Sequence, residues 1–258
     1  MKTVRIRSVL LAGMVAIAAV CAACGDSTQP ASAPAVNTPP ATNPVDPATA
    51  GNVTGSVKLE GTPPAADTIN LSSDDYCVKN ATTKTTRVYL VDGGGLQNVF
   101  VYVKDGLGNL KFPVPTTPVV LDQQGCWYVP RVFGIQVGQP FNIVNSDETL
   151  HNIHALPMSN REFNRGQKLK GEKYQTVFTV PEVMVPFKCD VHRWMNAWVG
   201  VVAHPFYAVS GAGGAFELKG LPPGTYTIEA WHEKLGTQTQ TVTLGAKETK
   251  PVAFTFKI

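Results

Sequence analysis

The chain has 258 residues, with 22 Lys or Arg against 19 Asp or Glu. Three of the positive charges, Lys2, Arg5 and Arg7, precede an apolar run at 9–20, and without them the charges balance. With no block of basic residues in the remainder, nothing in the charge pattern indicates nucleic acid as a partner. The low charged fraction of 16%, together with 23 Gly and 20 Pro, favours a turn-rich all-β protein over one built from long helices.

The first 23 residues have the pattern of a secretory signal peptide. Basic residues come first, an apolar run follows that is shorter than a membrane span, and Ala22 and Ala23 precede Cys24. Residues 20–25 resemble a bacterial lipobox with Cys21 in place of the usual Leu, which implies a lipid on Cys24. Ordinary cleavage without a lipid is the alternative. The chain is therefore predicted to be exported to the periplasm and anchored to a membrane.

Residues 24–50 consist mainly of Ala, Thr, Asn, Ser and Pro and contain no aromatic residue. Such a segment buries too little apolar surface to offset its chain entropy. We predict a disordered, semi-extended tether that ends at residue 50.

Short runs of β-forming residues, separated by Gly, Pro or Asn, fill the rest of the chain. This spacing is typical of β-sandwiches and barrels, and no alternation of strands and helices is visible. We divide the region into N-terminal strands with the Cys77 segment (51–95), a first β-domain (96–204) and a C-terminal β-domain (205–258). The predicted strands are 53–59, 88–91, 99–103, 119–121, 127–132, 135–137, 141–144, 176–180, 183–187, 198–203, 215–218, 225–231, 238–244 and 252–256.

Three cysteines remain after the signal peptide and Cys24, so at most one disulfide can form among them. Only Cys189 has a histidine within a few residues, in the sequence Cys189-Asp190-Val191-His192. We therefore predict a Cys77–Cys126 disulfide and a free Cys189, in keeping with an oxidising compartment.

Four side chains form a set that suits copper: His151, Cys189, His192 and Met195. A thiolate, two imidazoles and a thioether are soft and mixed donors, which serve both Cu(I) and Cu(II). Three of them occupy a CxxHxxM loop between two predicted strands, and His151 follows the strand at 141–144. Zinc is the alternative metal, although structural zinc sites rarely use Met. A metal-free site, with Cys and Met as ordinary core residues, is the other alternative.

The stretches 145–154 and 189–195 resemble the two copper-binding loops of the cupredoxins, and the short second loop is similar to that of amicyanins. The resemblance spans residues 96–204 and implies a Greek-key β-sandwich that holds one type 1 copper through the same four residues. It also implies that Asn152 links the two loops by hydrogen bonds. Asp190 departs from the usual Ser or Thr, and Val191 and Arg193 stand where amicyanin-like loops carry Pro.

The function implied by the resemblance is one-electron transfer without substrate binding. We expect an exposed ring edge of His192, flanked by Arg193, Trp194 and Pro186, to dock a periplasmic or membrane redox protein. His154 lies on the opposite face of the same strand as His151, and we expect it either to support the donor residues from outside or to pack in the core. Asp190 is expected to have the same supporting role. No hydrolase or zinc-protease motif is present, so no enzymatic activity is predicted.

Residues 214–231, with the pattern GxFxLxxLPPGxYxI, resemble the carboxypeptidase regulatory-like domains, which are small transthyretin-like β-sandwiches. We interpret this stretch as a hairpin that turns at Pro222-Pro223-Gly224. The C-terminal region is short for a complete sandwich, and residues 51–62 resemble the family's first strand. This leads to the hypothesis that the copper domain is inserted within the second sandwich.

Three functions remain open on the sequence alone. The first is electron transfer by a blue copper protein, and the second is copper storage or delivery. The third is a metal-free adhesion or carbohydrate-binding module, since some sandwiches of the second type bind carbohydrate.

Overall fold

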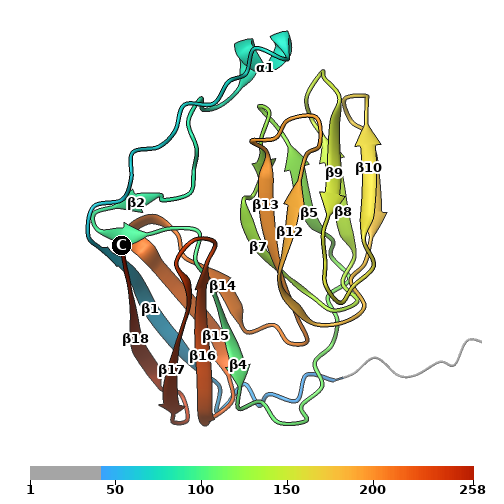
Figure 1. The fold of residues 1–258 in the computed structure, drawn as a ribbon. Helices are drawn as coiled ribbons and strands as arrows, with labels where there is room; N and C mark the ends of the chain where they lie inside the picture. The colour runs from blue at the N-terminus through green and yellow to red at the C-terminus, as the bar shows by residue number, and fades with distance from the viewer. Residues whose placement is uncertain (1–41) are drawn as a thin grey trace, which may run out of the picture. The chain divides into compact units, whose positions relative to one another are not determined.

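The computed structural model describes residues 42–258, and the predicted signal peptide, Cys24 and the tether up to residue 41 lie outside them. Strands dominate this part of the chain, as the all-β prediction requires (Figure 1). Its α-helix, α1, has only 6 residues (Asp75–Asn80). No helix among these residues is long and apolar enough to cross a membrane.

The strands form four sheets. In chain order they are β1 (Gly51–Glu60), β2 (Val91–Asp92), β3 (Gly95–Leu96), β4 (Phe100–Asp105), β5 (Val119–Gln123), β6 (Tyr128–Val129), β7 (Val132–Gln136), β8 (Phe141–Asn145), β9 (His151–Ala155), β10 (Phe163–Gln167), β11 (Lys173–Thr176), β12 (Glu182–Lys188), β13 (Asn196–Val202), β14 (Tyr207–Val209), β15 (Ala215–Leu221), β16 (Gly224–His232), β17 (Gly236–Leu244) and β18 (Thr249–Lys257), with a short 3-10 turn at Ala212–Gly214.

The inserted sandwich, residues 119–202, contains strands β5 to β13. One sheet has the order β10-β9-β12-β13-β7 and the other β11-β8-β5-β6. Their apolar faces share a core that includes Phe133, Phe141, Phe187 and Val199. In the first sheet β9 and β12 are antiparallel with His154 opposite Lys188, so the start of β9 and the end of β12 lie at the same edge.

The split sandwich consists of the segments 45–105 and 206–257, on either side of the insertion. Its strand β1 pairs antiparallel with β15 and parallel with β18, near the other end of the chain. The second sheet has the order β14-β4-β16-β17. This pairing agrees with the insertion hypothesis, because the strands that pair with β1 belong to the C-terminal region of the chain.

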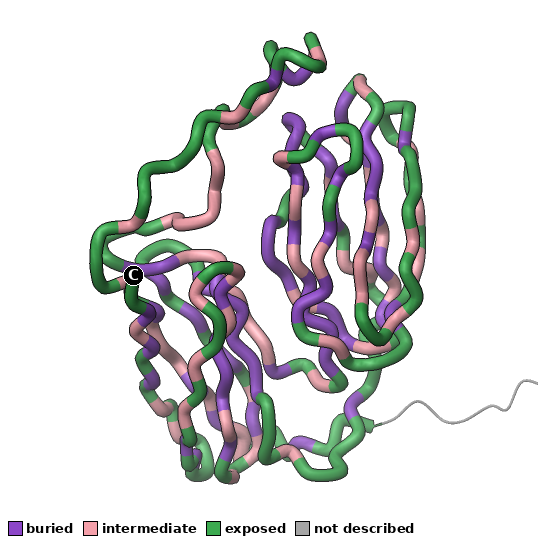
Figure 2. The backbone as a smooth tube through the Cα atoms, in the orientation of Figure 1, coloured by how far each residue is buried: buried purple, intermediate pink, exposed green. Residues whose placement is uncertain are grey.

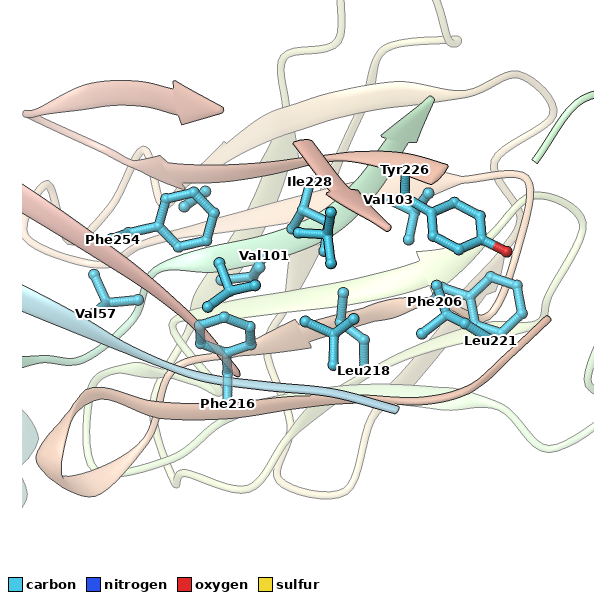
Figure 3. Packing of buried hydrophobic residues seen from close by; sticks show 14 of the residues in the cluster. Val57, Val101, Val103, Phe206, Phe216, Leu218, Leu221, Tyr226, Ile228 and Phe254 are labelled. Atoms are coloured by element: carbon cyan, nitrogen blue, oxygen red, sulfur yellow. The ribbon is translucent and has the colours of Figure 1, made fainter. Parts of the chain in front are cut away.

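Buried and exposed side chains alternate along the strands, which explains why the two sheets of each sandwich close over one core. In β18, Val252, Phe254 and Phe256 are buried while the residues between them are more exposed. The strands of both sandwiches show the same change between buried and exposed residues (Figure 2). In the split sandwich, Phe216 and Leu218 of β15 meet residues of the opposite sheet (Figure 3).

Two predicted boundaries are wrong. The tether does not extend to residue 50, because Val45 is buried in the split-sandwich core and Asp46 caps a turn with Thr49 and Ala50. Residues 96–105 were assigned to the copper domain, but β4 pairs with β14 and β16 of the split sandwich.

The hairpin predicted at 214–231 is also wrong. Strand β15 pairs with β1, whereas β16 pairs with β17 and β4. The turn at Pro222 and Pro223 therefore connects the two sheets of the split sandwich. Leu218 of β15 and Ile228 of β16 are nevertheless buried in the same core, from opposite sheets.

Glu182 of β12 gives a stability test for the inserted sandwich. Its carboxylate accepts hydrogen bonds from the backbone N–H groups of Met158, Ser159 and Asn160. Burial raises the pKa of Glu182, but these bonds outweigh burial and lower it below the ordinary value of 4.5. The stabilisation is therefore present above about pH 4.5 and is lost as the pH falls through the lowered pKa.

We expect Glu182→Gln to reduce the free energy of unfolding by ~1–2 kcal/mol at pH 7, because neutral hydrogen bonds replace charge-assisted ones. Urea unfolding at pH 7 and at pH 3 measures the effect. The difference from the wild-type protein should shrink at the lower pH, and an equal difference at both values would contradict the assignment.

Candidate metal centre

The four predicted donor residues lie at one edge of the inserted sandwich. His151 begins β9, Cys189 directly follows β12, and Met195 directly precedes β13. His192 lies in the tight loop between Cys189 and Met195, whose ends are tied by hydrogen bonds from Cys189 N to Met195 O and from Met195 N to His192 O. All four side chains are at most 1% exposed.

Three of the donor atoms face one another closely. The Nδ1 atoms of His151 and His192 are 2.9 Å apart, and the Cys189 sulfur lies 4.0 Å from Nδ1 of His192. The donor atoms of these three residues are all within 4.8 Å of one another. The start of β9 and the loop together gather one thiol and two imidazoles around a single point, and Met195 is buried in the same core as Cys189.

The sulfur of Cys189 lies in surroundings that favour the thiolate. Its backbone neighbours donate to it, with N–H groups of His192 at 3.3 Å and Asn152 at 3.5 Å. Burial raises the pKa of the Cys189 thiol, but hydrogen bonds from His151 and His192, together with these backbone groups, outweigh burial and lower it to about 6. The residue is thus prepared as an anionic sulfur ligand at neutral pH.

Each histidine also contacts a carboxylate through its outer nitrogen. Nε2 of His151 lies 2.8 Å from Oδ2 of Asp147, and Nε2 of His192 lies 3.1 Å from Oδ2 of Asp74. Burial raises the pKa of Asp147, but hydrogen bonds from His151 and from the N–H groups of Gly125 and Cys126 lower it overall. These contacts hold each ring with its Nδ1 directed at the centre.

Helix α1 covers His192. Asp74 caps the helix by accepting from the N–H groups of Tyr76 and Cys77, and it also accepts from the Thr149 hydroxyl at 2.6 Å. The predicted Cys77–Cys126 disulfide is present, and Cys189 is a free thiol, as predicted. Cys77 Sγ lies 3.8 Å from Nε2 of His192.

The expectation of an exposed His192 ring edge is therefore wrong. The segment that follows β1 reaches across to the donor loops, and its Asp74 and Cys77 cover the Nε2 edge of the ring, which we expected to meet solvent. Trp194 also helps to cover His192. Its Nε1–H donates to the carbonyl of Cys126 at 3.0 Å, and its ring packs against that of His192. Pro186 is half-buried in β12, and Arg193 is exposed.

Asn152 joins the two donor loops, as the resemblance implied. Its Oδ1 accepts from the N–H of Asp190, and its Nδ2 donates to Asn164. Asp190 also lies 2.9 Å from Nδ1 of His154, whose Nε2 is 2.8 Å from Glu162. His154 and Asp190 thus form a polar network on the outer side of the loops and do not face the donor atoms.

Asp74 and Asp147 contact the candidate donors, Thr149 contacts Asp74, and the sequence analysis missed all three. Asp147 lies four residues before His151, within the stretch 145–154 that resembles a copper-binding loop. That spacing was the one available signal. Asp74 is 118 positions from His192, and no local pattern connects them.

Comparison with known proteins gives one family match. The profile of the carboxypeptidase regulatory-like domain matches residues 196–257, which include β13 and the C-terminal part of the split sandwich. No curated protein sequence matches the chain.

Solved structures give weaker likenesses. A copper-containing nitrite reductase from Thermus scotoductus SA-01 is 21% identical, with 38% of this chain and 25% of that chain covered and a TM-score of 0.32. The chain thus spans about a quarter of the reductase's length. A mutant amicyanin in its Cu(I) form is 22% identical over 34% and 85% of the two chains, with a TM-score of 0.30. A purple cupredoxin from Nitrosopumilus maritimus is 26% identical over 29% and 81%, with a TM-score of 0.26. With TM-scores this low, any metal assignment rests on the donor residues themselves.

Proposed function

We propose that this chain is an exported copper protein that carries single electrons between redox partners. The observation that carries the proposal is the buried meeting of Cys189, His151 and His192, with Met195 in the same loop. This donor set fits copper, because two imidazoles, a thiolate and a thioether suit both oxidation states of the metal. Bound copper would supply a one-electron couple whose ligands all come from the protein.

The arrangement of this chain's own residues supports electron transfer over the alternatives. The donors are buried and held by a second layer of hydrogen bonds from Asp74, Asp147 and Asn152, and such support limits rearrangement when the metal changes charge. A delivery protein presents exposed soft donors for transfer to another site, whereas these four are enclosed. The proposal includes no enzymatic turnover.

The partner and the location belong to the same proposal. A signal peptide ending at residue 23 and a lipid on Cys24 would place the protein on a membrane in the periplasm, where a redox protein would be its partner. Arg193, exposed beside the donor loop, remains the candidate docking residue.

Visible and EPR spectra of the purified protein after addition of Cu(II) test the proposal. We expect an intense visible band from charge transfer between the Cys189 thiolate and Cu(II), and reversible bleaching on reduction. A colourless protein with the EPR spectrum of copper bound only by nitrogen and oxygen would contradict it. The same protein loaded with Zn²⁺ alone should stay colourless, because the d¹⁰ ion gives no visible charge-transfer band.

Asp74 is expected to tune the copper potential through His192. A carboxylate beside Nε2 makes the imidazole a stronger donor and favours Cu(II) over Cu(I), so Asp74→Asn should raise the reduction potential. A charge-assisted hydrogen bond of about 1.4 kcal/mol corresponds to roughly 60 mV for one electron. Protein-film voltammetry measures the shift.

Asp75→Asn is the matched control for this experiment. Asp75 is the next residue in the chain and is exposed. Its replacement with Asn removes the same formal charge as Asp74→Asn does. We expect it to leave the potential nearly unchanged. Equal shifts in the two variants would indicate a general charge effect and contradict the specific contact with His192.

A further inference from the structure

The disulfide that fastens α1 lies among metal-binding groups of its own. Two additional sets of donor atoms lie within 4.8 Å of one another: Asp74, Cys77 and His192 in one, and Asp147, Cys126 and His151 in the other. Each set takes one sulfur of the disulfide, one histidine of the first site and the carboxylate bound to that histidine. The proposed copper site uses only the Nδ1 side of these histidines and none of the cysteine pair.

In the oxidised protein the two sulfurs are bonded to each other and have no thiolate to offer a metal. Reduction changes this. A dithiol reductant gives two electrons and two protons to the disulfide and itself becomes a disulfide, leaving Cys77 and Cys126 as neighbouring thiols. A soft ion can then replace their two protons and be held between two thiolates.

The thiols would stay in place, because other contacts hold the covering segment. Tyr76 donates its hydroxyl to Asp147 at 3.2 Å, and Trp127 Nε1–H donates to the carbonyl of Thr83 at 3.2 Å. Thr149 and the helix cap secure Asp74, and Trp194 and Asp147 secure the backbone of Cys126. Reduction therefore does not by itself release α1.

We propose that reduction of Cys77–Cys126 creates a second, soft-metal site that takes one Cu(I) beside the first. The Cys77 and Cys126 thiolates bind the ion, and Nε2 of His192, 3.8 Å from Cys77 Sγ, is the third donor once it has released its ring proton to solvent. Both sulfurs are fully buried, and thiolates shielded from water suit Cu(I) better than hard cations. The chain would thus carry one copper when oxidised and two when reduced.

The experiment counts bound Cu(I) on the full chain. Cu(I) is titrated anaerobically against a chromophoric Cu(I) chelator, before and after the disulfide is reduced with a water-soluble phosphine that is then removed. We expect one tightly bound ion per intact chain and two per reduced chain. A reduced chain that binds no more Cu(I) than the intact chain would overturn the proposal.

Two variants assign the ions. Cys77→Ala/Cys126→Ala should bind one ion whether or not it is treated with phosphine, and circular dichroism verifies its fold. Cys189→Ser should bind none when intact and one after reduction, which isolates the second site. X-ray absorption of that single ion should show a nitrogen donor beside two sulfurs. Sulfur donors alone would overturn the role of His192.

The second site does not use Cys189, so its test is independent of the proposed function. Failure of the proposed function would appear as an intact wild-type chain that binds no copper. The gain of one ion on reduction would still support the second site in that case.

Discussion

Replacement of Cys189 with serine is expected to abolish the visible absorption of the copper-loaded protein. The band requires a thiolate ligand. At neutral pH the Cys189 thiol, whose pKa is lowered to about 6, ionises, whereas a serine hydroxyl remains protonated. Copper affinity should fall by more than the ~10–100-fold that loss of a supporting residue costs. Optical titration with Cu(II) and EPR measure both effects.

The matched control for Cys189→Ser is the Cys77→Ala/Cys126→Ala variant, which removes two sulfurs and keeps Cys189. Its visible band should persist. A band that survives in Cys189→Ser but disappears in the double variant would transfer the thiolate role to the other cysteines and contradict the proposed site.

Loss of the Cys77–Cys126 disulfide should lower the free energy of unfolding by about 4 kcal/mol. The two cysteines are 49 positions apart, and a cross-link that closes a loop of this length restricts the unfolded chain by roughly that amount. Most of the effect lies in the unfolded state, since the contacts around α1 remain in the native state. Guanidinium unfolding of the metal-free protein measures it.

Wild-type protein unfolded in the presence of reductant is the control for this measurement. Its stability should match that of the Cys77→Ala/Cys126→Ala variant, because both lack the cross-link. If the reduced wild-type protein and the oxidised wild-type protein unfold at the same denaturant concentration, the disulfide contributes nothing and the prediction is wrong.

The donor set could be predicted because its signal is local. Cys189, His192 and Met195 lie in one short loop, and their residue types alone indicate a soft metal. Asn145 ends β8 and His151 begins β9, so a strand and a turn place the fourth donor. The pairing of the remaining two cysteines followed by elimination, and the structure confirms it.

The cover over His192 could not be predicted. The polar composition around Asp74 and Cys77 indicates a surface loop, although the structure forms helix α1 there, and their contact with His192 spans more than 100 positions. Long-range polar contacts leave no periodic pattern. Strand β10 was missed for a related reason, because most of its residues are exposed and it lacks the alternation that identifies a half-buried strand.

The parallel pairing of β1 with β18 affects the order in which the protein can fold. These strands join Gly55 to Val252, so the split sandwich cannot close until nearly the whole chain has been synthesised. The inserted sandwich can form earlier from its own residues. Phe112 and Phe206, which flank it in sequence, pack edge to face with ring centroids 5.2 Å apart. Once folded, the inserted sandwich therefore brings β4 and β14 together and shortens the effective loop that the last strand must close.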